Sequence, residues 1–194
     1  VLSGIYLAEY GDNRFGSLVR FMADVLSGVP SIIMGIFAYV AVVLTTRSFS
    51  AISGGIALGI MMIPVVTRTT EESVKIVPNS IREASMALGI RRWKTIIFIV
   101  LSTAKSGIIT GIMLSIARIA GETAPLLFTA FGSDLWATGL NQPISALPLV
   151  IYRYAITPYA NWQAQAWGAA FILVSMVLIL NIGVRFIARS RYRK

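Results

Sequence analysis

The feature that most constrains this chain is a set of four long apolar runs separated by short polar segments. A helix needs about 20 apolar residues to cross a hydrocarbon core of about 30 Å. Because lipid offers no hydrogen bonds, a crossing segment must satisfy its own backbone N–H and C=O groups, as an α-helix does. The sequence therefore predicts an all-α, polytopic membrane helix bundle with about four complete spans. These spans are predicted over residues 21–44, 51–66, 106–131 and 165–187. In the first span, Gly28, Pro30 and Gly35 are expected to allow close helix packing and a kink.

The composition supports a membrane protein independently of the runs. Hydrophobic residues make up 56% of the 194 positions and charged residues 13%, with a mean hydropathy of +0.76. These values are too apolar for a soluble domain of this size. We expect one transmembrane domain over residues 1–194. Because Val1 opens directly into an apolar run, we also expect the chain to be the C-terminal portion of a longer protein with further spans upstream.

The basic residues follow the predicted topology. The net charge of +9 does not form one patch with interleaved aromatic residues, so nucleic acid is not a predicted partner. Fourteen of the 17 Lys and Arg residues lie on one predicted side of the membrane, and only Arg47 and Arg153 lie on the other. By the positive-inside rule, the side with fourteen is cytoplasmic. The basic tail 189–194 is predicted to contact anionic membrane lipid.

A short charged segment between the second and third runs is predicted to be a cytoplasmic loop, residues 78–94. Pro78 blocks continuation of the preceding helix, and Ser80 with Glu83 has the spacing of a capping box. Gly89 suits the left-handed conformation that ends a helix. The loop therefore predicts an isolated docking helix of about two turns. Its predicted face is formed by Ile81, Ala84 and Leu88.

The helices on either side of this loop are expected to extend beyond the membrane. The second span is predicted to continue through Lys75, where the i, i+4 residues Glu71 and Lys75 are interpreted as a solvated ion pair. The stretch 95–131 is too long for one span, so its first ten residues, 95–104, are predicted to form an interfacial or cytoplasmic helix.

The third run carries two charges, Arg118 and Glu122, whose i, i+4 spacing places them on one face of a continuous helix. Charges inside a bilayer are costly and usually mark a functional route. An arginine fork suits an oxyanion, because it donates two parallel hydrogen bonds. We therefore predict a substrate path at Arg118, Glu122 and Thr123, with a helix break at Gly121 and Pro125. The alternative is a mutually neutralising pair that only fixes helix packing.

The sequence contains no arrangement that indicates catalysis. It has no G-x-x-x-x-G-K-[ST] phosphate-binding loop, so the chain is not predicted to hydrolyse ATP itself. No Ser/His/Asp, Cys/His or paired-carboxylate arrangement suggests a catalytic site. His and Cys are both absent, so the usual zinc and thiol chemistries are not expected. We predict no enzyme activity, no cofactor and no metal.

Residues 83–101 resemble the coupling-loop signature of ABC importer permeases, which reads E-A-A, three residues, G, nine residues, I-x-L-P. Ser85 stands in place of the second Ala and Ser102 in place of the Pro. The sequence ARIAGETAPLLFTA, residues 117–130, resembles more specifically the phosphate-importer permease subunits of the PstA type. IYLAEYG (5–11), GVPSI (28–32) and PVVTRTTEE (64–72) also resemble that subunit, so the resemblance covers nearly the whole chain. The coupling-loop matches are Glu83, Ala84, Gly89, Ile99 and Leu101.

The resemblance implies an ABC importer permease fold and a multi-pass protein of the bacterial or archaeal cell (inner) membrane. It implies transport of phosphate, powered by a cytoplasmic ATP-binding subunit. The other implied partners are a second homologous permease subunit and a periplasmic or lipid-anchored phosphate-binding protein. The residues implied to couple the permease to the ATPase are Glu83, Ala84, Ser85, Leu88 and Gly89.

Three other functions remain open at this point. A permease for another oxyanion is the closest alternative, because only the 117–130 match indicates phosphate. A secondary carrier or channel could use Arg118 and Glu122 for ion coupling, although the chain shows no inverted repeat. A purely structural membrane subunit would not need either charge for transport.

Overall fold

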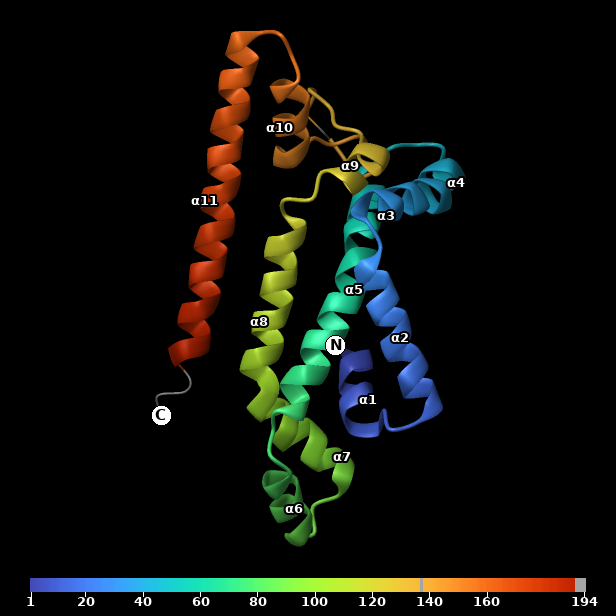
Figure 1. The fold of residues 1–194 in the computed structure, drawn as a ribbon, viewed down its shortest axis with the longest axis vertical. Helices are drawn as coiled ribbons and strands as arrows, with labels where there is room; N and C mark the ends of the chain where they lie inside the picture. The colour runs from blue at the N-terminus through green and yellow to red at the C-terminus, as the bar shows by residue number, and fades with distance from the viewer. Residues whose placement is uncertain (137, 191–194) are drawn as a thin grey trace. The chain divides into compact units, whose positions relative to one another are not determined.

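The computed structural model describes residues 1–136 and 138–190, with side chains described as far as Val184 (Figure 1). Apart from an isolated bridge between Phe131 and Ile144, the regular structure of these residues is helical, which confirms the all-α prediction. The predicted lipid contact of the tail 189–194 lies outside the described side chains. The helices are α1 Leu2–Tyr10, α2 Arg14–Gly28, α3 Ser31–Ala38, η1 Tyr39–Val43, α4 Leu44–Thr46, α5 Ala51–Lys75, α6 Asn79–Ala87, α7 Arg92–Lys94, η2 Thr95–Val100, α8 Leu101–Ile119, α9 Ala124–Thr129, α10 Leu147–Ala155 and α11 Ala160–Ser190.

The chain forms two compact units, each with its own apolar cluster. Unit 1 comprises residues 1–27, 63–115 and the segment from 182, and unit 2 comprises 28–62 and 116–181. The cluster of unit 1 joins the end of α5 to η2 and α8, and that of unit 2 joins α9 to α10. The unit 1 cluster is formed by Val74, Val77, Val100 and Ala104, and the unit 2 cluster by Leu126, Ala130 and Leu149.

Three described helical stretches are long and apolar enough to cross a membrane: Ala51–Lys75, Arg92–Ile119 and Ala160–Val184. A fourth span exists only if α2 and the helical stretch Ser31–Thr46 are counted together. The break in the span predicted over 21–44 is larger than the expected kink, because α2 and the stretch Ser31–Thr46 are bent by 102°. Pro30 lies at the N-cap of α3 in an extended conformation, with ψ of 137°, and its missing N–H and its ring prevent the helix from continuing.

The helices that flank the charged loop differ in how well the sequence predicts them. α5 does extend to Lys75, as expected. Residues 95–104 are helical, as predicted, and they belong to one helical stretch, 92–119, that includes the π-helical turn η2. The chain stays helical through Ser102, the position where the resembled signature has a proline. A serine there keeps the backbone N–H that a helix needs.

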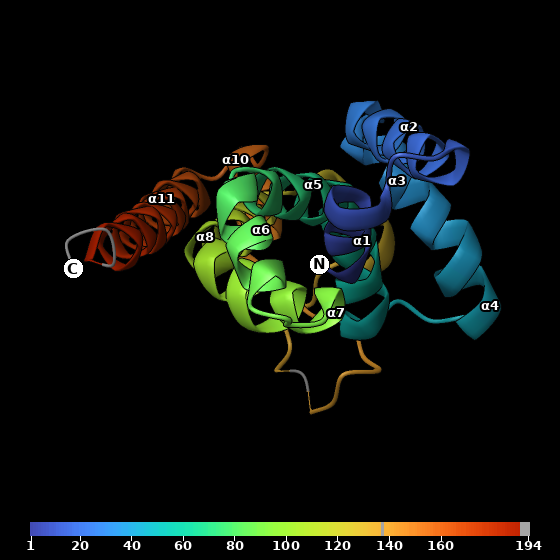
Figure 2. The ribbon, with the colours of Figure 1, turned by 90° about the horizontal axis from the view of Figure 1, so that it is seen from below.

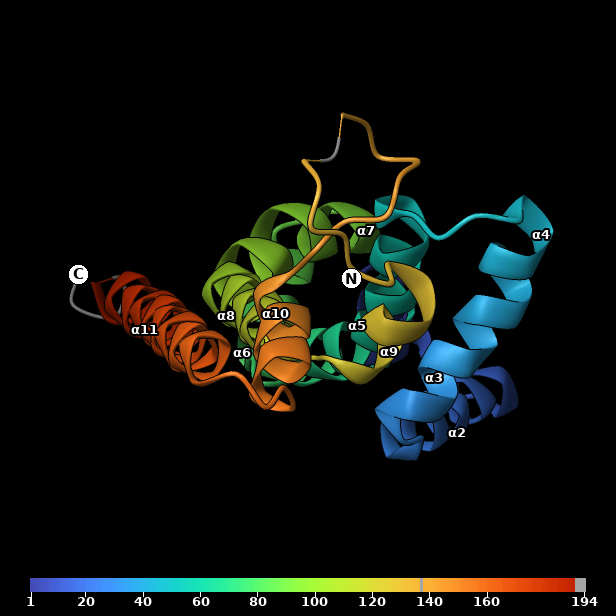
Figure 3. The same ribbon diagram turned by 90° about the horizontal axis from the view of Figure 1, so that it is seen from above.

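In unit 2, α9 packs closely against α3 (Figure 3). Gly35 of α3 makes this approach possible, since a Cβ at Gly35 would lie 2.8 Å from the Cα of Pro125. Ser50 and Ser53 fix the start of α5 to the same region. The backbone N–H of Ser50 and the hydroxyl of Ser53 both donate to the carbonyl oxygen of Thr129, at 3.1 and 2.8 Å.

Candidate functional site

The docking helix predicted from the charged loop exists as α6, but it begins differently. Pro78 is the N-cap and its carbonyl accepts a hydrogen bond from the N–H of Ile81 at 3.2 Å. The predicted capping box is therefore wrong, because Ser80 already lies inside the helix and no side-chain cap bond forms. Proline favours this earlier start, since its fixed φ suits the extended N-cap conformation.

The C-terminal end of α6 matches the prediction. Gly89 has φ of +78°, a left-handed conformation that costs other residues about 1–2 kcal/mol. The N–H of Gly89 donates to Met86 O at 2.9 Å, and the N–H of Ile90 donates to Ser85 O at 3.3 Å. This pair of bonds is a Schellman motif, which satisfies carbonyls at the helix end and reverses the chain towards α7.

One side of α6 faces the rest of unit 1. Ile81 packs on the apolar cluster of that unit. Ser85 is 3% exposed, and its hydroxyl lies 2.8 Å from that of Thr95, the first residue of η2. Ser85 therefore faces inward and is not available to a partner protein. At this position the hydroxyl fixes α6 to the helical stretch that continues into α8.

The C-terminal end of α6 carries exposed apolar groups. Leu88 is 81% exposed and Met86 is 46% exposed. Glu83, Ala84 and Gly89 are exposed as well. Of the predicted face, Ala84 and Leu88 are exposed, whereas Ile81 packs against the apolar cluster of unit 1. A short helix with an exposed apolar surface and a glycine-reversed end can insert into a groove on another protein.

Arg118 and Glu122 do not lie on one continuous helix. α8 ends at Ile119, and the N–H of Glu122 donates to Ile119 O at 3.1 Å in the following turn. The predicted helix break at Gly121 is confirmed, and the span predicted through residue 131 stops there. Arg118 is exposed and Glu122 half-buried, and the ion pairs formed by the described residues do not join them.

Thr123 begins the short helix that follows this break. It is the N-cap residue of α9, and its carbonyl accepts a hydrogen bond from the N–H of Leu127 at 3.1 Å. Pro125 lies in the first turn, where a proline needs no N–H partner. The three predicted path residues, Arg118, Glu122 and Thr123, therefore come together around a non-helical turn. Their side chains are at least partly exposed.

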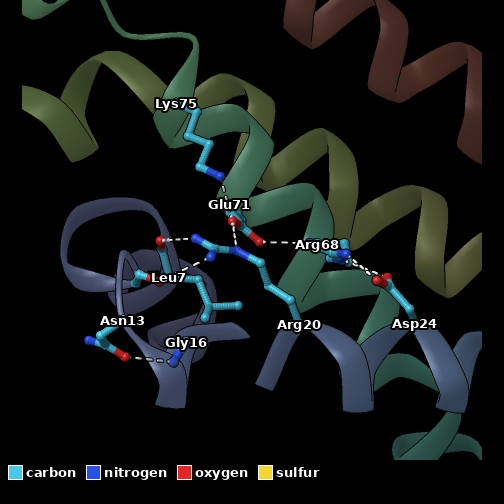
Figure 4. Close-up of polar contacts among 9 residues, drawn as sticks. Leu7, Asn13, Gly16, Arg20, Asp24, Arg68, Glu71 and Lys75 are labelled. Carbon is cyan, nitrogen blue, oxygen red and sulfur yellow. Dashed lines mark hydrogen bonds and ion pairs between the residues drawn. The ribbon is translucent and has the colours of Figure 1, made fainter. Parts of the chain in front are cut away.

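A second charged group, which the sequence reading missed, surrounds Glu71 of α5 (Figure 4). The side chain of Glu71 is only 2% exposed. Its carboxylate accepts hydrogen bonds from Arg20 Nε at 2.7 Å, Lys75 Nζ at 2.7 Å and Arg68 Nη1 at 3.1 Å. Arg68 also binds Asp24 of α2, with Nε to Oδ1 at 2.8 Å. Three cations and two carboxylates thus meet between α2 and α5.

This charged group also holds α1. Arg20 donates from Nη1 to Gly11 O at 3.0 Å and from Nη2 to Leu7 O at 2.8 Å. The Glu71–Lys75 pair predicted from spacing is confirmed, but its interpretation as a solvated pair is wrong, because Glu71 is buried. The i, i+3 and i, i+4 positions of Arg68 and Lys75 were visible in the sequence. Arg20, 51 residues away, was not.

Among the described residues, no group of three or more His, Cys, Asp or Glu side chains could hold a metal ion. The candidate site consists of the short helix α6 with its exposed end, a non-helical turn with two charges, and a buried charged group that joins helices.

Residues 1–193 match the family model described as "Binding-protein-dependent transport system inner membrane component". The chain is 46% identical over 187 residues to the phosphate transport system permease protein PstA of Xylella fastidiosa (strain 9a5c), covering 95% of this chain and 65% of that protein. It is 47% identical over 188 residues to the PstA protein of Yersinia pestis, covering 96% and 64%. The chain thus spans less than two thirds of the length of these relatives.

Among solved structures, the chain is similar to one of the MetNI methionine ABC transporter in an inward-facing conformation. The TM-score is 0.81, and the match covers 97% of this chain and 84% of that chain. At 17% identity, this likeness concerns the fold alone. It confirms the predicted ABC importer permease fold.

Proposed function

The chain belongs to the family of binding-protein-dependent transport system inner membrane components, and from this premise we propose that it is the permease subunit of an ATP-driven phosphate importer. The observation that carries the proposal is the similarity of almost the whole chain to phosphate transport system permeases. As a multi-pass membrane protein, it contributes helices to the translocation path. The protein resides in the cell (inner) membrane of a bacterium or archaeon.

The energy for transport comes from a cytoplasmic ATP-binding subunit, since the chain has no phosphate-binding loop of its own. The exposed C-terminal end of α6, with Leu88 at 81% exposure, inserts into a groove on that subunit. Movement of the ATP-binding subunits then moves α6 and the helices attached to it. Rigid-body rocking of packed helices opens the path alternately to the two sides of the membrane.

The path itself includes Arg118, Glu122 and Thr123. Because Arg118 does not pair with Glu122, its guanidinium can present parallel N–H groups to an oxyanion. The half-buried carboxylate of Glu122 disfavours tight retention of the anion, because like charges repel at short range. The complex also includes a second homologous permease subunit and a periplasmic or lipid-anchored phosphate-binding protein.

The experiment that tests the substrate is uptake into proteoliposomes that hold the complete transporter, with ATP supplied on the side of the ATP-binding subunit. Labelled phosphate and labelled sulfate are compared at equal concentration. We expect ATP-dependent uptake of phosphate and little uptake of sulfate. Preferential uptake of sulfate would contradict the phosphate assignment while leaving the permease role intact.

A further inference from the structure

The docking helix α6 has an attachment beyond its contacts with neighbouring segments of the chain. Ser85 bonds to η2, and Ile81 packs on the apolar cluster of unit 1, on which Ile5 and Ala8 of α1 also pack. Arg82 adds a polar contact with α1, since it binds Glu9, 73 residues away. The three elements α1, α6 and α7 lie next to one another (Figure 2). The docking helix is therefore connected to the start of the described chain.

All three guanidinium nitrogens of Arg82 are engaged. Nε and Nη2 donate to Glu9 Oε1 at 3.2 and 2.9 Å. Nη2 also donates to Val74 O at 3.0 Å, and Nη1 donates to Val77 O at 2.6 Å. These carbonyls lie at and just beyond the C-terminal end of α5, where a helix leaves acceptors unsatisfied. Arg82 thus joins α6, α1 and the end of α5 at one point.

The Arg82–Glu9 pair is shielded from water. The side chains are 17% and 6% exposed. An ion pair in such surroundings is screened much less than one at the surface, and removing one partner leaves the other charge without compensation. The pair can therefore hold α1 against α6 when a force acts on α6.

Arg92, the first residue of α7, also contacts the end of α1. Its Nη2 donates to the backbone carbonyl of Glu9 at 2.8 Å. Its guanidinium lies 4.8 Å from the centre of the Tyr10 ring, a cation–π contact. Arg82 precedes the Gly89 turn and Arg92 follows it, so both α6 and α7 contact the end of α1.

α1 in turn is fixed to α2. Arg20 of α2 donates to the carbonyls of Leu7 and Gly11 and binds Glu71 of α5. A continuous set of hydrogen bonds therefore runs from α6 through Arg82 and Glu9 to α1, and through Arg20 to α2. Such a contiguous polar network can carry displacement between elements, provided that its members move together.

We propose that Arg82 is a positioning residue for transport: with Glu9, it makes α1 move together with the docking helix, so that ATP-driven movement of α6 also moves α1 and α2. The inference rests on the proposed function of α6 as the docking helix. In this arrangement α6 drives three groups of helices at once: α5 and α8 through its sequence neighbours, and the α1–α2 pair through Arg82.

The first test is Glu9→Gln in the complete transporter in proteoliposomes. This substitution removes the charge on α1 and leaves the bonds of Arg82 to Val74 and Val77 intact. We expect assembly and ATP hydrolysis within about twofold of wild type, and phosphate uptake per ATP hydrolysed at least about fivefold lower. The matched control is Glu72→Gln, since Glu72 is exposed on α5 in the same unit. An unchanged ratio in Glu9→Gln would overturn the proposal.

A second test keeps the ion pair in place. The chain has no Cys, so Tyr10→Cys with Arg92→Cys gives one thiol on α1 and one on α7, at positions whose side chains are in contact. A short thiol-specific cross-linker then joins the two. If α1 and the segment α6–α7 move together, ATP-dependent uptake after cross-linking stays within about twofold of the uptake of the same variant before cross-linking. Loss of uptake on cross-linking would contradict the proposal. Failure of the proposed function is distinguishable, because wild-type uptake would then not depend on ATP.

Discussion

The end of α5 and the end of α8 carry opposite charges at the same spacing, yet these charges behave differently. Glu71 and Lys75 lie on one uninterrupted helix and form an ion pair at 2.7 Å. Arg118 and Glu122 are also four residues apart, but α8 ends at Ile119 between them. The i, i+4 rule applies only while the helix continues.

Under the proposed function, this difference separates a structural role for Glu71 from a transport role for Arg118. Glu71 is buried and compensated by cations from two helices, so it stabilises the contact of α2 with α5. Glu122 is half-buried in a turn, and Arg118 is exposed. Because Arg118 and Glu122 form none of the ion pairs of the described residues, their charges are free to contact a substrate. The comparison predicts that stability depends on the Glu71 group and that transport depends on Arg118.

The largest effect on stability is expected for Glu71→Ala. Removing the carboxylate leaves Arg20 and Arg68 without their shared buried partner, which costs about 3–5 kcal/mol for a buried ion pair. Denaturant unfolding followed by the fluorescence of the four Trp residues measures the change. The control is Glu72→Ala at the exposed neighbour, expected within about 0.5 kcal/mol. Equal losses of unfolding free energy in the two variants would show that the ion pairs of Glu71 do not stabilise the fold.

The next largest effect is expected for Gly35→Ala. Its new Cβ would lie 2.8 Å from the Cα of Pro125, so α3 and α9 must separate, at a cost of about 1–3 kcal/mol for overpacking. Gly55→Ala is the matched control, because a Cβ at Gly55 meets no atom within 4 Å. There the substitution should stabilise α5 by about 0.5–1 kcal/mol. The same unfolding measurement compares the two, and a stabilising Gly35→Ala would show that the contact is loose.

A smaller effect is expected for Lys75→Ala. Lys75 binds the same carboxylate as Arg20 does, but its side chain is 51% exposed. Exposed ion pairs contribute about 0.2–1 kcal/mol. Unfolding of the variant should therefore resemble wild type much more than Glu71→Ala does. A loss as large as that of Glu71→Ala would mean that Lys75, and not the arginines, holds the group together.

The smallest effect on stability, with the largest effect on transport, is expected for Arg118→Ala. An exposed side chain outside the ion pairs of the described residues should change the free energy of unfolding by no more than about 0.5 kcal/mol. Phosphate uptake should fall at least tenfold, roughly the loss of one charge-assisted hydrogen bond. Uptake measured beside unfolding tests both parts, and normal uptake would remove Arg118 from the path.

The sequence predicted those features that depend on neighbouring residues. The extension of α5 to Lys75, the left-handed Gly89 and the break at Gly121 all follow from local chemistry. The capping box at Ser80 failed because Pro78 fixes an earlier helix start. Proline and glycine near residue 30 suggested a kink, but not the complete interruption between α2 and α3.

Contacts between distant segments could not be predicted in the same way. The approach of Arg20 to Glu71 and of Arg82 to Glu9 depends on how α1 and α2 fold back on α5 and α6. No periodicity in the sequence encodes that arrangement. The inward direction of Ser85 was also hidden, because its partner Thr95 lies in the π-helical turn η2, which no local signal indicated.

The most direct test of the account is uptake of labelled phosphate into proteoliposomes that contain the full-length permease, its partner permease and the binding protein, with and without the ATP-binding subunit and ATP. We expect uptake only when both the subunit and ATP are present, because α6 must be moved by a partner. Uptake without the ATP-binding subunit would identify a carrier or channel and would contradict the docking role of α6.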